Sequence, residues 1–163
     1  MMRLFDIVLF DAGEGLAKKL GFYNLVRIGT RFPSSSLLTA SSEHELFKSA
    51  NNPSVKCIVI DKNMVNGVVA GKLADIKKPM LINANSVVTE DRGETMRNIG
   101  SLKRSISRTK FKSTDIGLAS LAKDANELFS CAQLVEIAKL IGIDENAERR
   151  ALSAIGAAYA EKE

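Results

Sequence analysis

Hydrophobic and polar positions follow two alternating periods along the chain. Short apolar runs bounded by turn residues predict strands over 4–10, 24–30, 55–61, 79–88 and 115–122. Segments with apolar residues at helical spacing predict helices over 14–22, 42–50, 65–77, 93–110, 130–143 and 145–163. This alternation favours parallel strands joined by crossover helices, so we expect one α/β domain over 1–163.

Turn and cap residues set the expected helix ends. Gly21 ends the first helix, and Ser42 with Glu45 three residues later forms a capping box. Ser130 and Asp144 stand where N-caps of the last two helices are expected.

The strand count leaves the shape of the sheet open. A closed eight-stranded barrel usually needs about 250 residues, and this chain of 163 residues shows five clear strands. Either the barrel is reduced or incomplete, or the sheet is open, or the serine-rich segment "SSSLLTA" contains a further weak strand. All three alternatives keep the α/β class with parallel strands.

Charge is concentrated in one segment. The window 92–112 carries a net charge of +6, whereas the whole chain carries +4. On a helix, Ile99, Leu102 and Ile106 would face the core with Met96 at the margin. Arg97, Arg104 and Arg108 would lie in a row on the opposite side with no acidic residue between them.

Such a row of arginines favours a phosphate-binding surface, because guanidinium groups bind phosphate in a bidentate manner. A solvated helix face and an acidic partner protein are the alternatives. Phe111 is the one aromatic residue nearby, so the backbone of structured or duplex RNA fits better than stacking on unpaired bases.

Candidate catalytic chemistry is sparse. The single histidine, His44, is expected on the surface, Cys57 in the core, and Cys131 at a helix start without a nearby base. Neither "DAGEG" nor "NGVVAG" has the spacing of a nucleotide-binding loop, and "NANS" at 83–86 fits turn chemistry better than ligand binding. The strand-edge aspartates Asp6, Asp11, Asp61 and Asp115 leave a magnesium site open. We therefore assign no catalytic residue, metal site or cofactor.

An ordered series of segments carries a family resemblance. "PMLINANSVV", the helix with Arg97, Lys103, Arg104 and Arg108, "DIGLASLAKDANEL", "SCAQLVEIAKLIGIDE" and "ERRALSAIGAA" follow one another over residues 79–156. In this order they resemble ribonuclease P protein component 3, an archaeal family with a small TIM-like barrel. The chain departs from the family pattern at Phe129, at Cys131 and in a shortened middle region.

The resemblance implies a non-catalytic subunit of ribonuclease P, in which the RNA cleaves the 5′ leader of precursor tRNA. The implied partners are the ribonuclease P RNA, precursor tRNA indirectly, and another protein subunit of the particle. The residues expected to contact RNA are Arg92, Arg97, Lys103, Arg104, Arg108, Lys110, Lys112 and Lys123.

Two other function classes stay open at this point. A small metal-dependent phosphoesterase could use strand-end aspartates as ligands and the arginines as a phosphate clamp. A protein-binding module could use the same arginines to meet an acidic partner. The apolar runs are too short to span a membrane and no signal-type segment is visible, so we expect a cytoplasmic protein.

Overall fold

The computed structural model describes residues 2–27, 37–73, 76, 78–108 and 116–160. Parallel strands alternate with helices along this part of the chain, so the predicted α/β class is confirmed. The strands are β1 (Phe5–Val8), β2 (Asn24–Arg27), β3 (Leu37–Thr39), β4 (Cys57–Ile60), β5 (Met80–Asn83) and β6 (Ile116–Ala119). The α-helices are α1 (Glu14–Lys19), α2 (Glu43–Ala50), α3 (Gly67–Leu73), α4 (Ala84–Val87), α5 (Arg92–Arg108), α6 (Cys131–Ile141) and α7 (Glu145–Ala160), and the 3₁₀ helices are η1 (Lys62–Met64) and η3 (Ala125–Glu127).

The strands form two parallel sheets that meet at one point. One sheet has the order β3-β4-β5-β6, and the other consists of β1 and β2. A bridge between Val8 and Ala122, with a 2.8 Å hydrogen bond from the Leu9 amide to the Ala122 carbonyl, places β1 beside the end of β6. The last strand therefore neighbours the first, which is the connectivity of a barrel.

Closure of that barrel is not confirmed. Across the described ranges, no strand pairing joins β2 to β3. The short strand β3 does lie inside the serine-rich segment "SSSLLTA", where the sequence allowed a weak strand. The structure is thus an α/β arrangement of parallel strands with one open side between β2 and β3 across the residues described.

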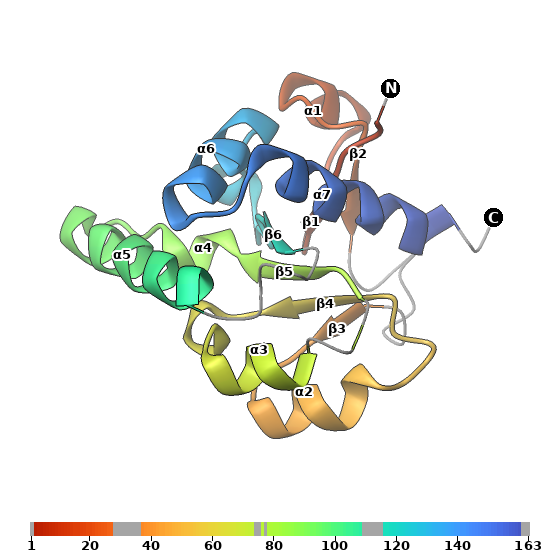
Figure 1. Ribbon diagram of the computed structural model, residues 1–163. Helices are drawn as coiled ribbons and strands as arrows, with labels where there is room; N and C mark the ends of the chain where they lie inside the picture. Colours follow the sequence, from red (N-terminus) through yellow and green to blue (C-terminus); the bar gives the residue numbers. More distant parts are fainter. Residues whose placement is uncertain (1, 28–36, 74–75, 77, 109–115, 161–163) are drawn as a thin grey trace.

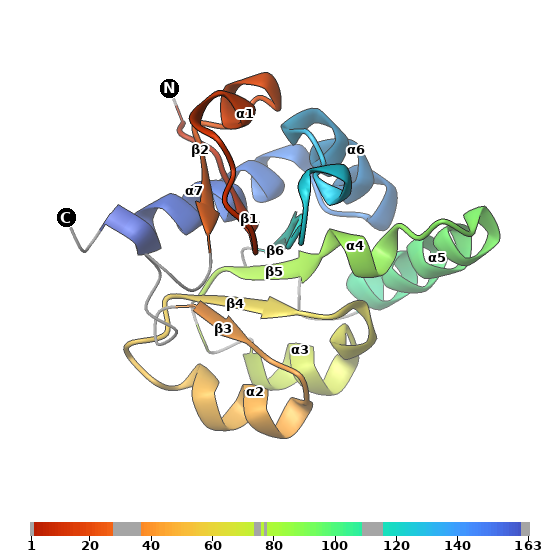
Figure 2. The ribbon, with the colours of Figure 1, turned by 180° about the vertical axis from the view of Figure 1, so that it is seen from behind.

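The helices lie around this sheet as Figure 1 shows. α2 and α3 lie next to β3 and β4, whereas α6 and α7 lie near β6 and β1. α5 follows α4 and projects from the body, and Figure 2 shows the same arrangement from behind. Most of α5 therefore has one side toward the protein and the other toward solvent.

The core consists largely of the strands themselves. Every residue of β1, β4 and β6 is buried, as expected for parallel strands covered on both faces. α7 packs closely against two of them: a Cβ on Gly117 of β6 would lie 2.6 Å from Ala151 Cβ, and one on Gly156 of α7 would lie 1.9 Å from the Phe5 ring. Glycine is needed at both positions because no side chain fits there.

Several predicted element ends need correction. The strand predicted over 79–88 ends at Asn83, because the Asn83 side chain accepts a hydrogen bond from the Asn85 amide and caps α4. The helix predicted over 65–77 begins at Gly67, after Asn66 accepts hydrogen bonds from the Val68 and Val69 amides. In both cases an asparagine side chain stops one element and starts the next.

Most predicted caps are confirmed. Ser130 forms a complete capping box with Gln133, and Asp144 accepts hydrogen bonds from the amides of Asn146 and Ala147. The Ser42 hydroxyl accepts a hydrogen bond from the Glu45 amide, but the Glu45 carboxylate accepts hydrogen bonds from the amide and hydroxyl of Ser41. The predicted capping box therefore forms only in part. Among the described residues, no helix has the length and apolar character needed to cross a membrane.

Candidate nucleic-acid interface

Helix α5 starts from a well-defined cap. The Thr95 amide bonds to the Asp91 carbonyl, and the Asp91 carboxylate accepts the Glu94 amide at 2.8 Å. Thr89 and Thr95 bond to each other through both backbone and side chain, which fixes the entry of the chain into the helix. These hydrogen bonds cap the N-terminus of α5 and fix the direction in which the helix leaves the preceding turn.

The two faces of α5 follow the sequence pattern. Leu102 and Ile106 are buried, and Ile99 packs against the core, as predicted. Met96 is an exception, because 62 % of it is exposed rather than lying at the edge of the core. Met96 therefore lies outside the buried face of α5.

Arg97, Arg104 and Arg108, hereafter the arginine row, are all exposed. Within the described part of the chain, none of them forms an ion pair with a carboxylate. A guanidinium nitrogen of Arg97 lies 3.5 Å from the position of a Cβ on Gly93, and one of Arg104 lies 3.7 Å from that on Gly100. Both arginines thus lie back over a glycine one turn earlier, along the helix surface.

The other predicted contact residues are less concentrated. Arg92 and Lys103 are exposed on α5, with Lys103 beside Gly142 at the end of α6. Lys123 is also exposed but belongs to the segment after β6, where its amide bonds to Glu127. Lys110 and Lys112 lie outside the described residues. The structure therefore brings together the arginine row, with Arg92 and Lys103 on the same helix, and leaves Lys123 on a separate segment.

The one acidic residue within α5 has a partner that the sequence did not reveal. The ammonium group of Lys62 lies 3.4 Å from the Glu94 carboxylate, and the Lys62 side chain is only 18 % exposed. Lys62 is the second residue after β4, so its place near a strand end was the one signal that the sequence offered. Glu94 therefore pairs with Lys62, and no ion pair between Glu94 and an arginine of the row is found among the described residues.

A small hollow lies between η1 and α5. It has a volume of about 190 Å³, and we call it the η1–α5 notch. Its lining residues are Lys62, Asn63, Val65, Asn98, Ser101 and Leu102. Asn98 is held in place by a hydrogen bond from its amide to the Val87 carbonyl. The notch therefore lies between the segment that follows β4 and the side of α5 that carries Ser101.

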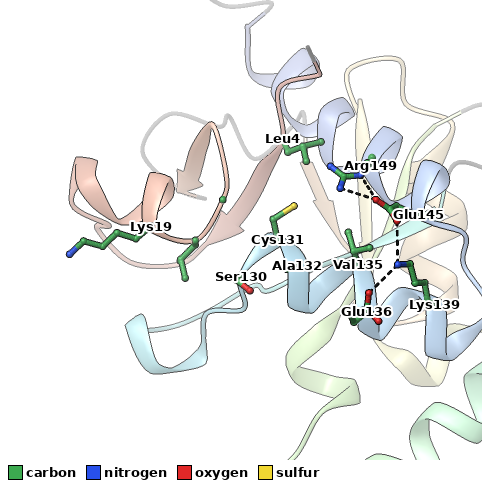
Figure 3. Close-up of a pocket in the computed structure, with 12 residues that line it drawn as sticks. Leu4, Lys19, Ser130, Cys131, Ala132, Val135, Glu136, Lys139, Glu145 and Arg149 are labelled. Atoms are coloured by element: carbon green, nitrogen blue, oxygen red, sulfur yellow. Dashed lines mark hydrogen bonds and ion pairs between the residues drawn. The ribbon is translucent and has the colours of Figure 1, made fainter.

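A larger groove of about 610 Å³ lies among α1, α6 and α7 (Figure 3). Its charged side chains largely neutralise one another: Lys139 bonds to Glu136 and Glu145, and Glu145 also bonds to Arg149. Cys131 is at its wall, and burial raises the pKa of its thiol. This groove has far less unpaired charge than the arginine row.

Two buried carboxyl groups lie between β6 and β1. The Asp6 carboxylate accepts the Ser120 amide at 2.8 Å, the Ile7 amide, and the Ser120 hydroxyl. The Glu148 carboxylate, from α7, accepts the Leu118 amide at 2.8 Å. Leu118 in β6 and Ser120 just after β6 are two residues apart, so their amides point to the same side, away from β5. We call this region, where side chains replace the backbone ladder, the seam.

Burial controls the protonation of the seam. It raises the pKa of Asp6 from 3.8 to about 6, against the opposing effect of the hydrogen bonds from Ser120 and Ile7. It also raises the pKa of Glu148, and the nearby Asp6 carboxylate adds to that rise. One oxygen of Glu148 has no hydrogen-bond partner in the part of the chain described. Burial disfavours the charged form of both carboxyl groups because removing a charge from water is costly.

The three strand-edge aspartates that the structure describes do not come together as a magnesium site would require. The prediction that Asp6 lies at a strand edge is wrong, because Asp6 lies within β1 and is fully buried. Asp11 pairs with Arg27, Asp61 caps η1, and Asp115 lies outside the described residues. In the described ranges, no three His, Cys, Asp or Glu side chains are grouped so that they could hold a metal ion.

The remaining candidate residues have structural surroundings. His44 is exposed on α2, and Cys57 is buried in β4, where burial raises its thiol pKa to about 12. In "NANS", Asn85 bonds to the carbonyls of Ser120 and Glu127, and Ser86 accepts the Lys62 amide. These side chains hold strand ends together, in agreement with turn chemistry.

Compared with known proteins, the chain matches no family model and no curated protein.

Proposed function

We propose that the chain is an RNA-binding protein subunit of ribonuclease P. In this role it binds the catalytic RNA and another protein subunit and supports cleavage of the 5′ leader of precursor tRNA. The RNA carries the chemistry, so the protein contributes binding and shape rather than a catalytic residue. The family resemblance of residues 79–156 is the source of the ribonuclease P assignment.

The observation that supports RNA binding is the arginine row. Three exposed guanidinium groups share one face of a helix that projects from the body, and none has a carboxylate partner within the described residues. From Arg97 to Arg108 the helix rises about 16 Å, which is several times the roughly 3.4 Å of helix axis that separates successive phosphates of one strand in duplex DNA. The row therefore has the length to meet several phosphates of one RNA strand.

The local electrostatics favour a polyanion over a small anion. Coulomb repulsion between neighbouring arginines is relieved by a ligand that carries charge at regular intervals. Arginine forms bidentate hydrogen bonds with phosphate oxygens, which suits backbone contacts that do not read sequence. A metal-dependent phosphoesterase has no such support, because Asp6, Asp11 and Asp61 are engaged at separate places.

The test is a triple variant, Arg97→Ala with Arg104→Ala and Arg108→Ala. We expect RNA affinity to fall about 100-fold, at roughly 1 kcal/mol for each lost contact. The slope of log affinity against log salt should fall by about three units, one for each lost phosphate contact. Filter binding or fluorescence anisotropy with a precursor tRNA and with ribonuclease P RNA measures both quantities.

A second triple variant serves as the matched control. Lys18→Ala, Lys19→Ala and Lys48→Ala remove the same charge from exposed positions on α1 and α2. This variant should keep most of the salt slope. An equal loss in both variants, or an unchanged slope in the arginine variant, contradicts the proposal. A complex with an acidic protein that survives nuclease treatment would instead favour the protein-binding alternative.

The ribonuclease P assignment needs a separate measurement. Protein isolated from its native cell should carry a large structured RNA, and the isolate should cleave the 5′ leader from precursor tRNA. Nuclease treatment should abolish that activity, because the RNA performs the cleavage. An isolate with no associated RNA contradicts the assignment.

A further inference from the structure

The η1–α5 notch has the size of a site for one compact group. Its volume of about 190 Å³ is several times the roughly 30 Å³ that a water molecule occupies in the liquid. It is also smaller than the range of about 300 to 1,000 Å³ in which drug-sized ligands bind. A phosphate-sized group fits these limits, whereas a whole nucleotide does not.

The notch is lined by hydrogen-bond donors and one cation. Lys62 supplies an ammonium group with three N–H donors, Ser101 a hydroxyl group, and Asn63 an amide. The Ser101 hydroxyl has no hydrogen-bond partner among the residues described. Val65 and Leu102, which are buried, close the apolar side. An anion with several acceptor oxygens matches this lining better than a cation or an apolar group does.

The Lys62 ammonium group in the notch is only weakly paired with the Glu94 carboxylate. The distance of 3.4 Å between Lys62 Nζ and Glu94 Oε1 exceeds the roughly 2.7 to 2.9 Å of a strong charge-assisted hydrogen bond. The Glu94 side chain is 45 % exposed, and its other carboxylate oxygen accepts a similarly long hydrogen bond of 3.4 Å from the Thr89 hydroxyl, whereas Lys62 is 18 % exposed. A phosphate oxygen that enters the notch can therefore replace the carboxylate at small cost.

The notch also adjoins the arginine row. Ser101 lies four residues after Arg97 and three before Arg104, so it is on the same side of α5 as both. A backbone that follows the row therefore passes the mouth of the notch. Because Lys62 belongs to η1 and not to α5, a phosphate bound there would contact two elements at once.

We propose that the η1–α5 notch binds one phosphodiester group of the RNA, with Lys62 as the cationic anchor and Ser101 as a hydrogen-bond donor. This inference rests on the proposed function for the identity of the ligand. The arginine row supplies affinity along the helix, and the notch fixes where the RNA backbone lies along it, since phosphate contacts set register.

The first experiment uses inorganic phosphate as the probe. Amide resonances of the full chain are followed by NMR during titration with phosphate, at constant ionic strength maintained with chloride. We expect saturable shifts at Asn63, Asn98 and Ser101, and a loss of at least fivefold in affinity in Lys62→Met. The matched control Lys48→Met removes an exposed lysine of α2 and should bind phosphate as the wild type does.

A second variant changes the affinity in the opposite direction. Glu94→Gln removes the anion that competes for Lys62, so phosphate should bind severalfold more tightly. Glu90→Gln, which removes an exposed carboxylate just before the helix, should have a smaller effect. An improved affinity cannot result from a misfolded variant. Weaker or unchanged phosphate binding in Glu94→Gln overturns the proposal.

Measurements of RNA binding distinguish a failure of this inference from a failure of the proposed function. In Lys62→Met, the salt slope for precursor tRNA should fall by about one unit. A reduced slope in the arginine variant with an unchanged slope in Lys62→Met overturns the notch and leaves RNA binding by the row intact. Phosphate shifts confined to the arginine row, with none at the notch, overturn it as well. An unchanged slope in the arginine variant overturns the proposed function itself.

Discussion

The arginine row and the seam both hold ionisable groups without an opposite charge beside them, yet they differ in their access to water. Arg97, Arg104 and Arg108 are exposed, so water and salt ions solvate their charges. Asp6 and Glu148 are fully buried, and burial raises the pKa of both carboxyl groups. Solvent therefore stabilises the charges of the arginine row, whereas burial disfavours the charged form of the carboxyl groups in the seam.

This difference separates binding from folding. An exposed row of cations costs the folded protein little and remains available to a polyanion. Buried carboxyl groups cost more, but at the seam they accept the backbone amides of Leu118 and Ser120, which would otherwise lack partners where β1 and β6 separate. Changes in the seam should therefore alter stability, and changes in the row should alter RNA affinity.

The largest expected effect on stability is that of Gly156→Ala. The added Cβ would lie 1.9 Å from the Phe5 ring, so α7 would have to move away from β1. Overpacking costs about 1 to 3 kcal/mol and more where the clash is severe, as here, so we expect a net loss of about 3 kcal/mol after the gain of roughly 1 kcal/mol from replacing glycine in a helix. Urea denaturation at pH 7 measures the free energy of unfolding. A stability equal to that of the wild type would show that α7 does not pack tightly over the seam.

An intermediate effect is expected for the pH dependence of stability. Burial raises the pKa of Asp6 to about 6 in the folded protein, from 3.8. Between about pH 4 and pH 6 the folded protein therefore binds more protons than the unfolded chain, so this contribution to stability is complete at low pH and is lost as the pH rises. Two pKa units correspond to roughly 3 kcal/mol, taken as an upper limit. Burial of Glu148 acts in the same direction.

The measurement is the difference between the wild type and Asp6→Asn over this pH range. Asparagine keeps the acceptor for the Ser120 and Ile7 amides and places a donor beside the Ser120 hydroxyl, so the geometry is preserved. The wild type should lose about 2 kcal/mol more than the variant between pH 4 and pH 6.5. Glu90→Gln, at an exposed position, is the control and should follow the wild type. Parallel profiles for the wild type and Asp6→Asn would contradict this prediction.

The smallest effect is expected for Gly100→Ala on α5. A Cβ at this position has only an Arg104 guanidinium nitrogen nearby, at 3.7 Å, so no clash arises. Alanine should stabilise the protein by about 0.5 to 1 kcal/mol, because glycine is unfavourable in a helix interior. The salt slope for RNA should not change, since every arginine remains. Destabilisation by Gly100→Ala would show that this face of α5 is covered, contrary to the exposed row.

Much of the fold could be predicted from the sequence because its signals are local. Ser130 and Asp144 act within three residues of their own positions, and both caps were predicted correctly. The apolar spacing of Ile99, Leu102 and Ile106 gave the buried face of α5. Element ends at Asn66 and Asn83 were missed because an asparagine cap interrupts a pattern that is otherwise apolar.

The candidate site was predicted only in part. Arg97, Arg104 and Arg108 were identified because seven and four residues bring side chains to one helix face. The contact between Lys62 and Glu94 joins positions 32 residues apart, and no local pattern announces it. The notch forms where η1 meets α5, two elements far apart in the sequence, so it could not be predicted.

The sequence alone determined the parallel α/β class, most helix caps and the arginine row. Each of these depends on residues only a few positions apart, whose geometry is set by helix and strand periods. Tertiary structure decided the seam, where Asp6 and Ser120 are 114 residues apart, and it decided the burial that raises the Asp6 pKa. Proximity and burial arise only when distant segments pack together, and a charge pattern along the chain carries no information about either.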